Sequence, residues 1–293
     1  MSETTFTLSG GAGNQLFGIY AGLLFQAAIG TQVIFNYRPC GGYSSSSSIL
    51  ETLKFDPVLK TSPFLANDLS IFRTTNYQLR TLINPYNLIL NRFSSNYISP
   101  ELSHDFNLLK TKNKKNIFGY FQSSYYYESM KKLGYGHPKL VNPSKWYNTY
   151  LIKIKEESPI IMHVRRGDYL KYSNIYQYLE SDYYTKAIYS LPNNLKENPI
   201  WIFSDDQQQA NDLIKHLPNR NYFVIDQNSQ KAIEVLFLMS NGVSHITANS
   251  TFSWWSATLS ISSTHIVAPK AWFKDRPTPA DLLPKKWELI SCK

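Results

Sequence analysis

The chain has 293 residues, of which 43% are hydrophobic and 15% aromatic, and this composition excludes a disordered protein and predicts about two domains of ordinary size. Lysine and arginine total 30 against 21 acidic residues, so the net charge is +9, which favours phosphates, nucleic acid or an anionic membrane surface without choosing among them. Cys40 and Cys292 have no metal-type spacing, no signal peptide opens the chain and no run reaches the ~18 apolar residues of a membrane span, so we expect a soluble cytoplasmic protein without a disulfide framework or a zinc site.

The first half of the chain begins as a β–α–β unit. Residues 4–9 and 31–37 predict strands, and the apolar-rich segment 14–28 between them predicts a helix. A serine-rich loop (44–48) and a Tyr- and Asn-rich region follow, in which we predict no regular elements. Residues 116–121 predict a short strand that closes this half.

The loop Gly10–Gln15 (GGAGNQ) connects the first predicted strand to the first helix. Its glycines permit positive φ angles and close approach of a ligand, and the free N–H groups at a helix start favour an anion or a polar sugar. The loop is not a dinucleotide fingerprint, because Leu16 occupies the third glycine position and the next strand does not end in an acid. A tight turn without a ligand is the alternative interpretation.

From residue 159 onward, short apolar runs alternate with amphipathic stretches. This alternation predicts β–α–β units and a parallel sheet covered by helices on both faces, with right-handed crossovers. We interpret 136–158 as a linker with a helix inside it, which gives an N-terminal domain of residues 1–140 and a C-terminal domain of residues 141–293. The favoured architecture is α/β, with two Rossmann-like domains facing a cleft. The predicted elements are strands at 159–165, 199–204, 221–225, 243–247 and 264–268, and helices near 182–191, 206–216, 229–241 and 251–261.

The stretch IIMHVRRGDYL (160–170) places a histidine and two arginines at the carboxyl end of a predicted strand, where open α/β sheets bind ligands. Consecutive side chains on a strand point to opposite faces, so Arg165 and Arg166 cannot do the same work. We expect one guanidinium to bind a phosphate and the other to pair with a carboxylate such as Asp168. His163 lies on the same side as Arg165. An exposed basic loop is the alternative.

The next predicted strand ends in FSDD, with Asp205 and Asp206 at its carboxyl end. These acids are candidates for holding a base or sugar hydroxyls. Capping of the following helix is the strong alternative, and a metal site is disfavoured because two acids from one loop rarely suffice.

The third motif is NSTFSWW, in which Asn249, Ser250 and Thr251 are good N-cap residues before an aromatic helix. Such a helix start offers N–H groups and hydroxyls to a pyrophosphate. Trp254 and Trp255 are expected to pack in the core. An arginine and a helix N-terminus that converge at one sheet edge can neutralise a leaving diphosphate without a metal ion.

Together these residues resemble the α-1,2-fucosyltransferases of glycosyltransferase family 11. The matches occur in family order and span nearly the whole chain. Ala12 stands where that family usually has leucine, and Asn241 follows LMS where cysteine is frequent. The matching motifs are GGAGNQLF (10–17), GYFQS (119–123), HVRRGDY (163–169), SDYYTKAI (181–188), FSDD (203–206), LMS (238–240), NSTFSWWSA (249–257) and APKAWF (268–273).

The resemblance implies a GT-B-like fold and an inverting transfer of L-fucose from GDP-β-L-fucose to the 2-hydroxyl of an acceptor sugar, usually galactose. It implies GDP-fucose and a galactose-containing oligosaccharide as partners, with no cofactor, no metal and no nucleic acid. The N-terminal domain would face the acceptor, and the C-terminal domain would bind GDP-fucose.

By the same resemblance, Arg165 or Arg166 contacts the β-phosphate, with His163 nearby. By looser analogy, Asp205 or Asp206 reads guanine. The remaining implied contacts are Ser250, Thr251 and Phe252 for the nucleotide, and Gly11, Gly13, Asn14 and Gln15 for fucose and acceptor.

Several alternatives stay open at this level. Asp168, Asp205, Asp206 and Glu234 are candidates by residue type for the base that takes the acceptor proton, while Asn14 can orient the hydroxyl but is not a base. A non-catalytic binder of nucleotides or polyanions is a rival, as is a transferase of the same fold that uses another sugar nucleotide. Peripheral contact with a membrane is a further open alternative, and the sequence specifies no oligomeric state.

Overall fold

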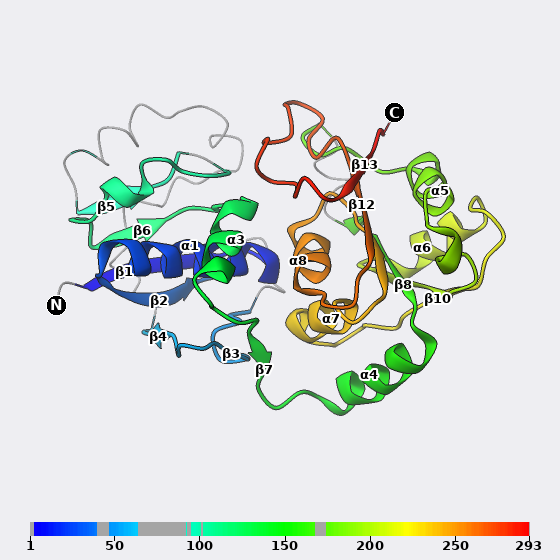
Figure 1. Cartoon of the computed structure of the whole chain (residues 1–293), viewed down its shortest axis with the longest axis horizontal. Coiled ribbons are helices and arrows are strands. Elements are labelled where there is room, and N and C mark those ends of the chain that lie inside the picture. Colours follow the sequence, from blue (N-terminus) through cyan, green and yellow to red (C-terminus); the bar gives the residue numbers. More distant parts are fainter. Residues whose placement is uncertain are drawn as a thin grey trace. The chain divides into compact units, whose positions relative to one another are not determined.

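The computed structural model of this chain describes residues 3–39, 47–63, 92, 95–100, 102–167 and 174–292. The chain divides into two compact units, Met1–Val141 and Asn142–Lys293, and each unit has its own parallel sheet (Figure 1).

Unit 1 contains a five-stranded parallel sheet in the order β4-β2-β1-β6-β5. Strand β1 lies in the middle, and the long helix α1 packs on it and on β2. The short strands β3 and β7 form a separate antiparallel pair. The elements are β1 (Glu3–Ser9), α1 (Ala12–Ile29), β2 (Gln32–Arg38), β3 (Leu53–Lys54), β4 (Lys60–Thr61), β5 (Asn96–Ile98), η3 (Leu108–Lys110), β6 (Asn116–Phe118), α3 (Ser124–Lys132) and β7 (Lys139–Leu140).

Unit 2 contains a six-stranded parallel sheet in the order β10-β9-β8-β11-β12-β13. Numbered along the chain, this is the order 3-2-1-4-5-6 of doubly wound nucleotide-binding folds. The order reverses between β8 and β11. The elements are α4 (Lys145–Glu157), β8 (Ile160–Val164), α5 (Ser181–Tyr189), η5 (Asn193–Leu195), β9 (Ile200–Ser204), α6 (Gln207–Ile214), β10 (Tyr222–Val224), α7 (Ala232–Met239), β11 (Ser244–Ile246), α8 (Thr251–Leu259), β12 (His265–Pro269) and β13 (Glu288–Ile290).

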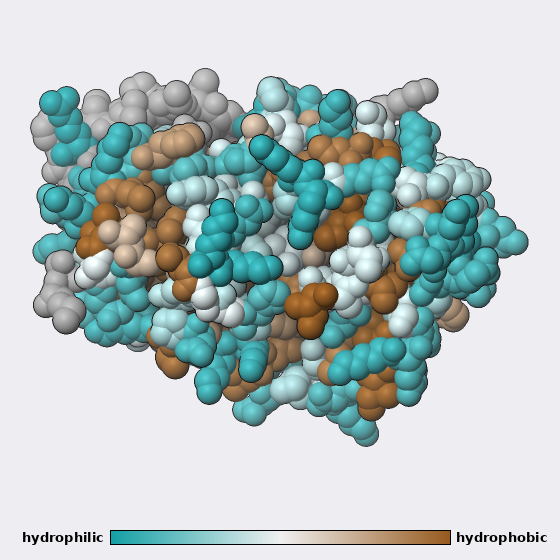
Figure 2. Space-filling model, in the orientation of Figure 1, coloured by the Kyte–Doolittle hydropathy of each residue, from teal (hydrophilic) through white to brown (hydrophobic). Residues whose placement is uncertain are grey.

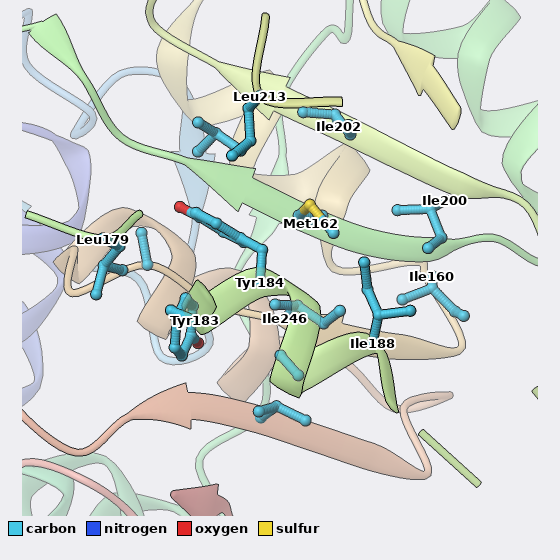
Figure 3. Close-up of a cluster of buried hydrophobic side chains, with 14 of the residues drawn as sticks. Ile160, Met162, Leu179, Tyr183, Tyr184, Ile188, Ile200, Ile202, Leu213 and Ile246 are labelled. Atoms are coloured by element: carbon cyan, nitrogen blue, oxygen red, sulfur yellow. The ribbon is translucent and has the colours of Figure 1, made fainter. Parts of the chain in front are cut away.

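Side chains of β8 alternate between two buried layers. Ile160, Met162 and Val164 pack with residues of α5 and α6 in the hydrophobic cluster of Figure 3. His163 faces the other side, where its ring lies 5.6 Å from that of Phe252 on α8. Every residue of β8 is buried and all of them except His163 are apolar, as expected of a strand that is covered on both faces.

The predicted elements of the C-terminal half are confirmed, since the five strands correspond to β8–β12 and the four helices to α5–α8. The helix expected inside the linker is α4. The strand predicted at 116–121 is shorter, because β6 ends at Phe118. The elements that sequence periodicity missed are β3, β4, β5, β7, β13 and α3. These strands have two or three residues, too few to show a period of two.

Figure 2 shows apolar side chains scattered among hydrophilic ones on the face that it draws. Within the described ranges, none of the helices combines the length and the apolar character needed to cross a membrane.

Trp254 joins α8 to the C-terminal segment, and its replacement tests this part of the core. The side chain is fully buried, and Nε1 donates a hydrogen bond to the carbonyl of Leu282 at 2.8 Å. Trp254→Phe leaves that buried carbonyl without its donor and opens a cavity, so we expect the free energy of unfolding to fall by about 2 kcal/mol. Urea titration followed by circular dichroism measures the change.

The matched control is Trp146→Phe. Trp146 also donates from Nε1 to a carbonyl, that of Asp226 at 3.0 Å, but this bond is exposed to solvent. We expect a loss of no more than about 0.5 kcal/mol there. Equal losses in the two variants would contradict the role given to Trp254.

Candidate functional site

The reversal of strand order in unit 2 locates a candidate ligand site. Strands β8 and β11 are adjacent and parallel, and the chain leaves β8 toward α5 on one face of the sheet and leaves β11 toward α8 on the other. Ligands of open α/β sheets bind outside the carboxyl ends of strands at such a point. HVRRGDY begins in the last two residues of β8, FSDD begins in the last two residues of the neighbouring β9, and NSTFSWW follows β11, so the three motifs share one edge of one sheet.

Arg166 is held inside this edge. Only 3% of the residue is exposed, and its guanidinium lies 4.5 Å from the ring centre of Tyr178 and 5.9 Å from that of Tyr184. Its Nη1 donates to the carbonyl of Leu179 at 2.8 Å. The Arg166 side chain therefore ties the carboxyl end of β8 to the segment before α5.

Arg165 lies on the same side of the strand as His163, and 28% of its side chain is exposed. Its Nη1 pairs with Oδ2 of Asp205 at 3.0 Å, while Oδ1 of the same carboxylate accepts from the backbone N–H of Arg166 at 2.8 Å. One carboxylate thus fixes both the guanidinium of Arg165 and the backbone after it. Of the two arginines, Arg165 is the one whose charge can reach a ligand.

Gly167 permits this arrangement. A Cβ at position 167 would lie 2.4 Å from Oδ2 of Asp205, closer than real Cβ contacts allow. Any larger residue would push the carboxylate away from Arg165. The glycine of the HVRRGDY motif therefore permits the geometry of the loop.

His163 is a neutral ring beside Arg165. Burial is the main cause that lowers the pKa of His163 to about 3, and the charge of Arg165 adds to it. Only 4% of the residue is exposed, and Nδ1 has no hydrogen-bond partner within the described ranges. A buried ring nitrogen without a partner can donate to or accept from a bound polar group.

Asp206 caps helix α6. Its Oδ1 accepts from the backbone N–H of Gln209 at 3.0 Å, and Oδ2 accepts from Nε2 of the same residue at 2.9 Å. The backbone hydrogen bond is the main cause that lowers the pKa of Asp206. The capping alternative thus describes Asp206, whereas Asp205 of the same motif faces Arg165.

The NSTFSWW motif is anchored before it reaches the helix. Nδ2 of the buried Asn249 donates to the carbonyls of Gln177 and Trp272, both at 2.8 Å. Ser250 is the N-cap of α8, and its hydroxyl accepts from the N–H of Phe252 at 3.3 Å. Thr251 and Phe252 form the half-buried first turn. Trp254 and Trp255 are buried in the core, as the sequence predicted.

The GGAGNQ loop of unit 1 follows the carboxyl end of β1, the middle strand of its own sheet. Gly10 has φ of 79°, which a side chain would strain. Oδ1 of Asn14 accepts from Nε2 of Gln122 at 3.0 Å, so the loop meets the segment after β6. Gly11 is the exposed N-cap of α1, and Gly13 is buried in its first turn.

Gln15 is enclosed rather than available. It is fully buried, its Nε2 donates to the carbonyls of Gly10 and Ser47, both at 2.9 Å, and its Oε1 accepts from the N–H of Ile49 at 3.0 Å. The Gln15 amide therefore holds the loop in shape, which differs from the direct substrate contact expected from the sequence.

Asp168 and Glu234 are the other two acids considered as candidates for the base. Asp168 lies outside the described residues. Glu234, in the first turn of α7, is buried and accepts hydrogen bonds from the backbone N–H and the hydroxyl of Ser144, the N-cap of α4. Glu234 thus joins two helices within unit 2.

A metal site has no support in the described ranges, which hold no group of three or more His, Cys, Asp or Glu residues that could bind an ion. The expectation of metal-independent chemistry stays a prediction.

Two glutamines at these sheet edges were not singled out from the sequence. Gln122 belongs to the GYFQS motif, which signals the segment but not the role of its amide. Gln227 follows β10, and its Nε2 donates to the carbonyl of Ser204 at 2.6 Å. Its buried Oε1 has no partner among the residues that the structure describes. No sequence signal identified Gln227.

Comparison with known proteins places the chain among glycosyltransferases. A family model described as "Glycosyl transferase family 11" matches residues 41–290. The O-antigen biosynthesis glycosyltransferase WbnK of Escherichia coli is 28% identical, over 91% of this chain and 93% of that protein. An α-1,2-colitosyltransferase of Escherichia coli is 27% identical, over 99% of each chain.

Solved structures of similar fold are fucosyltransferases. NodZ from Bradyrhizobium superposes with a TM-score of 0.52 at 14% identity, and the match covers 90% of this chain and 93% of NodZ. POFUT1 in complex with GDP-fucose superposes with a TM-score of 0.51 at 11% identity, over 91% of this chain and 98% of POFUT1. This likeness confirms the GT-B-like α/β fold expected from the sequence.

Proposed function

Because this chain belongs to glycosyltransferase family 11, we propose that it transfers L-fucose from GDP-β-L-fucose to the 2-hydroxyl of a galactose-type acceptor, with inversion and without a metal ion. Unit 2 binds the nucleotide sugar, and unit 1 faces the acceptor. The observation that carries the proposal is the partly exposed guanidinium of Arg165, fixed by Asp205 at the point where the strand order reverses.

In this proposal, Arg165 is the catalytic arginine. Negative charge grows on the β-phosphate as the bond to the anomeric carbon breaks, so a guanidinium held in place stabilises the transition state more than the ground state. The first turn of α8, with Ser250, Thr251 and Phe252, offers backbone N–H groups to the same diphosphate. Neutral His163 binds a polar atom of the donor through Nδ1.

Other residues act through their neighbours. Arg166 and Gln15 are positioning residues, since their polar groups are engaged within the chain. Asp205 orients Arg165, which supports a role in phosphate binding rather than in direct recognition of guanine. Asn14, with Gly11 and Gly13 beside it, orients the acceptor hydroxyl.

Fewer acids remain candidates for the base that accepts the hydroxyl proton than residue type alone allows. Asp205, Asp206 and Glu234 each accept hydrogen bonds from within the chain. Asp168 lies outside the described residues, and we propose it for the base on its residue type and its place in the HVRRGDY motif.

A second donor is favoured by one of the relatives. The α-1,2-colitosyltransferase is similar over nearly its whole length, and colitose is L-fucose without its 3-hydroxyl. A transferase built to hydrogen-bond that hydroxyl rejects a donor lacking it, whereas an apolar pocket discriminates weakly. GDP-colitose is therefore the alternative donor for the same site.

The test incubates the purified protein with lactose and either GDP-fucose or GDP-colitose, without added metal and with EDTA. We expect a trisaccharide carrying fucose on the 2-hydroxyl of galactose, identified by mass spectrometry and NMR. Product from GDP-colitose alone would replace the proposed donor. Tight RNA binding without turnover of either donor would favour the non-catalytic polyanion binder.

The cytoplasmic location expected from the sequence stays a prediction.

Gly167→Ala tests the loop that holds Arg165. The added Cβ would collide with Oδ2 of Asp205, so the carboxylate must leave Arg165. We expect kcat/KM for GDP-fucose to fall about tenfold, a loss typical of a misplaced catalytic group. Gly136→Ala is the control, because a Cβ there meets nothing within 4 Å. Full activity of Gly167→Ala would show that the pairing of Arg165 with Asp205 is dispensable.

A further inference from the structure

Unit 1 carries a group of contacting aromatic rings that the donor site does not use. The ring of His104 lies 4.1 Å from that of Tyr125, nearly parallel at 23°, and 4.4 Å from that of Phe106. Phe106 is 79% exposed and Tyr125 is 42% exposed. We call His104, Phe106 and Tyr125 the aromatic platform.

The platform lies at the carboxyl edge of the unit 1 sheet. His104 and Phe106 follow β5, and Tyr125 opens α3 after β6. The N–H of Gln122 donates to the carbonyl of Leu102 at 2.5 Å, and the side chain of Gln122 reaches Asn14. Hydrogen bonds thus connect the segment that carries His104 and Phe106 to the GGAGNQ loop.

Buried polar contacts hold the platform in place. Oδ2 of the buried Asp105 accepts from the hydroxyl of Tyr97 at 2.6 Å, and its Oδ1 accepts from the N–H of Asn107 at 2.9 Å. The N–H of Asp105 donates to the hydroxyl of Tyr126 at 2.9 Å. Rings fixed before a ligand arrives lose little conformational entropy on binding.

We propose that the aromatic platform binds a sugar ring of the acceptor by stacking. One face of a galactose ring presents C–H groups and is apolar, so it can cover exposed aromatic rings while its hydroxyls stay in water. Phe106 and Tyr125 are both exposed and both contact His104, so their rings form one apolar surface that a ligand can cover. This inference rests on the proposed function, because it is the transfer reaction that requires an acceptor sugar.

The experiment measures the steady-state kinetics of Phe106→Ala and Tyr125→Ala with GDP-fucose and lactose or a longer galactose-terminated oligosaccharide. We expect the KM for the acceptor to rise about tenfold in Phe106→Ala, the loss of one stacking contact, while the KM for GDP-fucose stays within about twofold. Phe106→Tyr keeps an aromatic ring and should retain a near-normal KM for the acceptor. Tyr189→Ala is the matched control, since this aromatic residue is 71% exposed at the end of α5 in unit 2.

Two readouts separate failure of this inference from failure of the proposed function. If wild-type protein transfers fucose but both alanine variants keep the wild-type acceptor KM, the inference is overturned and the function stands. If no donor is turned over, the function fails, and saturation-transfer NMR with the oligosaccharide alone then decides whether platform substitutions weaken sugar binding. Unchanged acceptor KM with loss of an oligomer on size exclusion would instead make the platform a protein interface and overturn the inference.

Discussion

Arg165→Ala is expected to lower kcat/KM for GDP-fucose by about 10²–10³-fold, the range found when one preorganised donor to a developing negative charge is removed. The guanidinium of Arg165 stands at the carboxyl end of β8, beside His163 and held by Asp205. Its partial exposure lets it meet the diphosphate of a donor. The loss should appear mainly in kcat, because the phosphate charge develops in the transition state.

Arg165→Lys is expected to recover little of this activity. Lysine keeps the charge but lacks the planar fork that can bind a phosphate and Asp205 together. We expect its kcat/KM to remain at least about tenfold below wild type. Arg220→Ala is the control, because Arg220 donates to the carbonyls of Leu195 and Asn198 before the start of β9, at the opposite edge of the same sheet. Near-normal kcat/KM in Arg165→Ala, measured by release of GDP, would exclude Arg165 as the catalytic arginine.

The edge of the sheet where these residues meet was predictable from the sequence. Short apolar runs separated by amphipathic segments predict parallel strands, and the polar motifs at their carboxyl ends must then share one edge. The order of the strands in the sheet was not predictable from the sequence. The order depends on which helix faces can be buried together, and these packing choices involve residues far apart in the chain, such as those joining α5 and α6 to β8.

The division of labour between the two arginines shows a second limit. Strand alternation predicted that Arg165 and Arg166 face opposite sides. It did not predict which side is closed, because the closing groups are Tyr178, Leu179 and Tyr184, which follow more than ten residues later. A motif defines residue types, whereas burial depends on the segment that happens to cover them.

Polar residues that resemble ligand contacts were the hardest to interpret. Gln15 and Asp206 both stand at helix starts next to glycine- or acid-rich loops, where either capping or binding is chemically reasonable. The structure shows their atoms engaged within the chain. The aromatic platform was not predicted from the sequence, because its rings come from two segments without a shared periodic pattern.

Arg166→Ala is expected to lower the free energy of unfolding by about 3 kcal/mol, in contrast to Arg165→Ala at the partly exposed neighbouring position, for which we expect a change of no more than about 0.5 kcal/mol. Removing this side chain opens a space against the rings of Tyr178 and Tyr184 and leaves the buried carbonyl of Leu179 without its donor. Activity falls as well, because the backbone that carries Arg165 is no longer tied to the segment before α5. Saturating GDP should offset part of the stability loss, since a ligand that binds the native state stabilises it by mass action.

Arg166→Met separates packing from charge in this prediction. Methionine refills much of the space and carries no charge, so its burial has no desolvation penalty for an ion. Replacing buried charged groups by apolar ones of similar volume often costs little stability. We therefore expect Arg166→Met to lose no more than about 1.5 kcal/mol in urea titration. If Arg166→Ala instead unfolds at the wild-type urea concentration while its kcat/KM falls as far as that of Arg165→Ala, Arg166 also belongs to the substrate site and its structural role is excluded. The pair of measurements, stability for one arginine and turnover for the other, thus decides which guanidinium belongs to the protein interior and which belongs to the substrate.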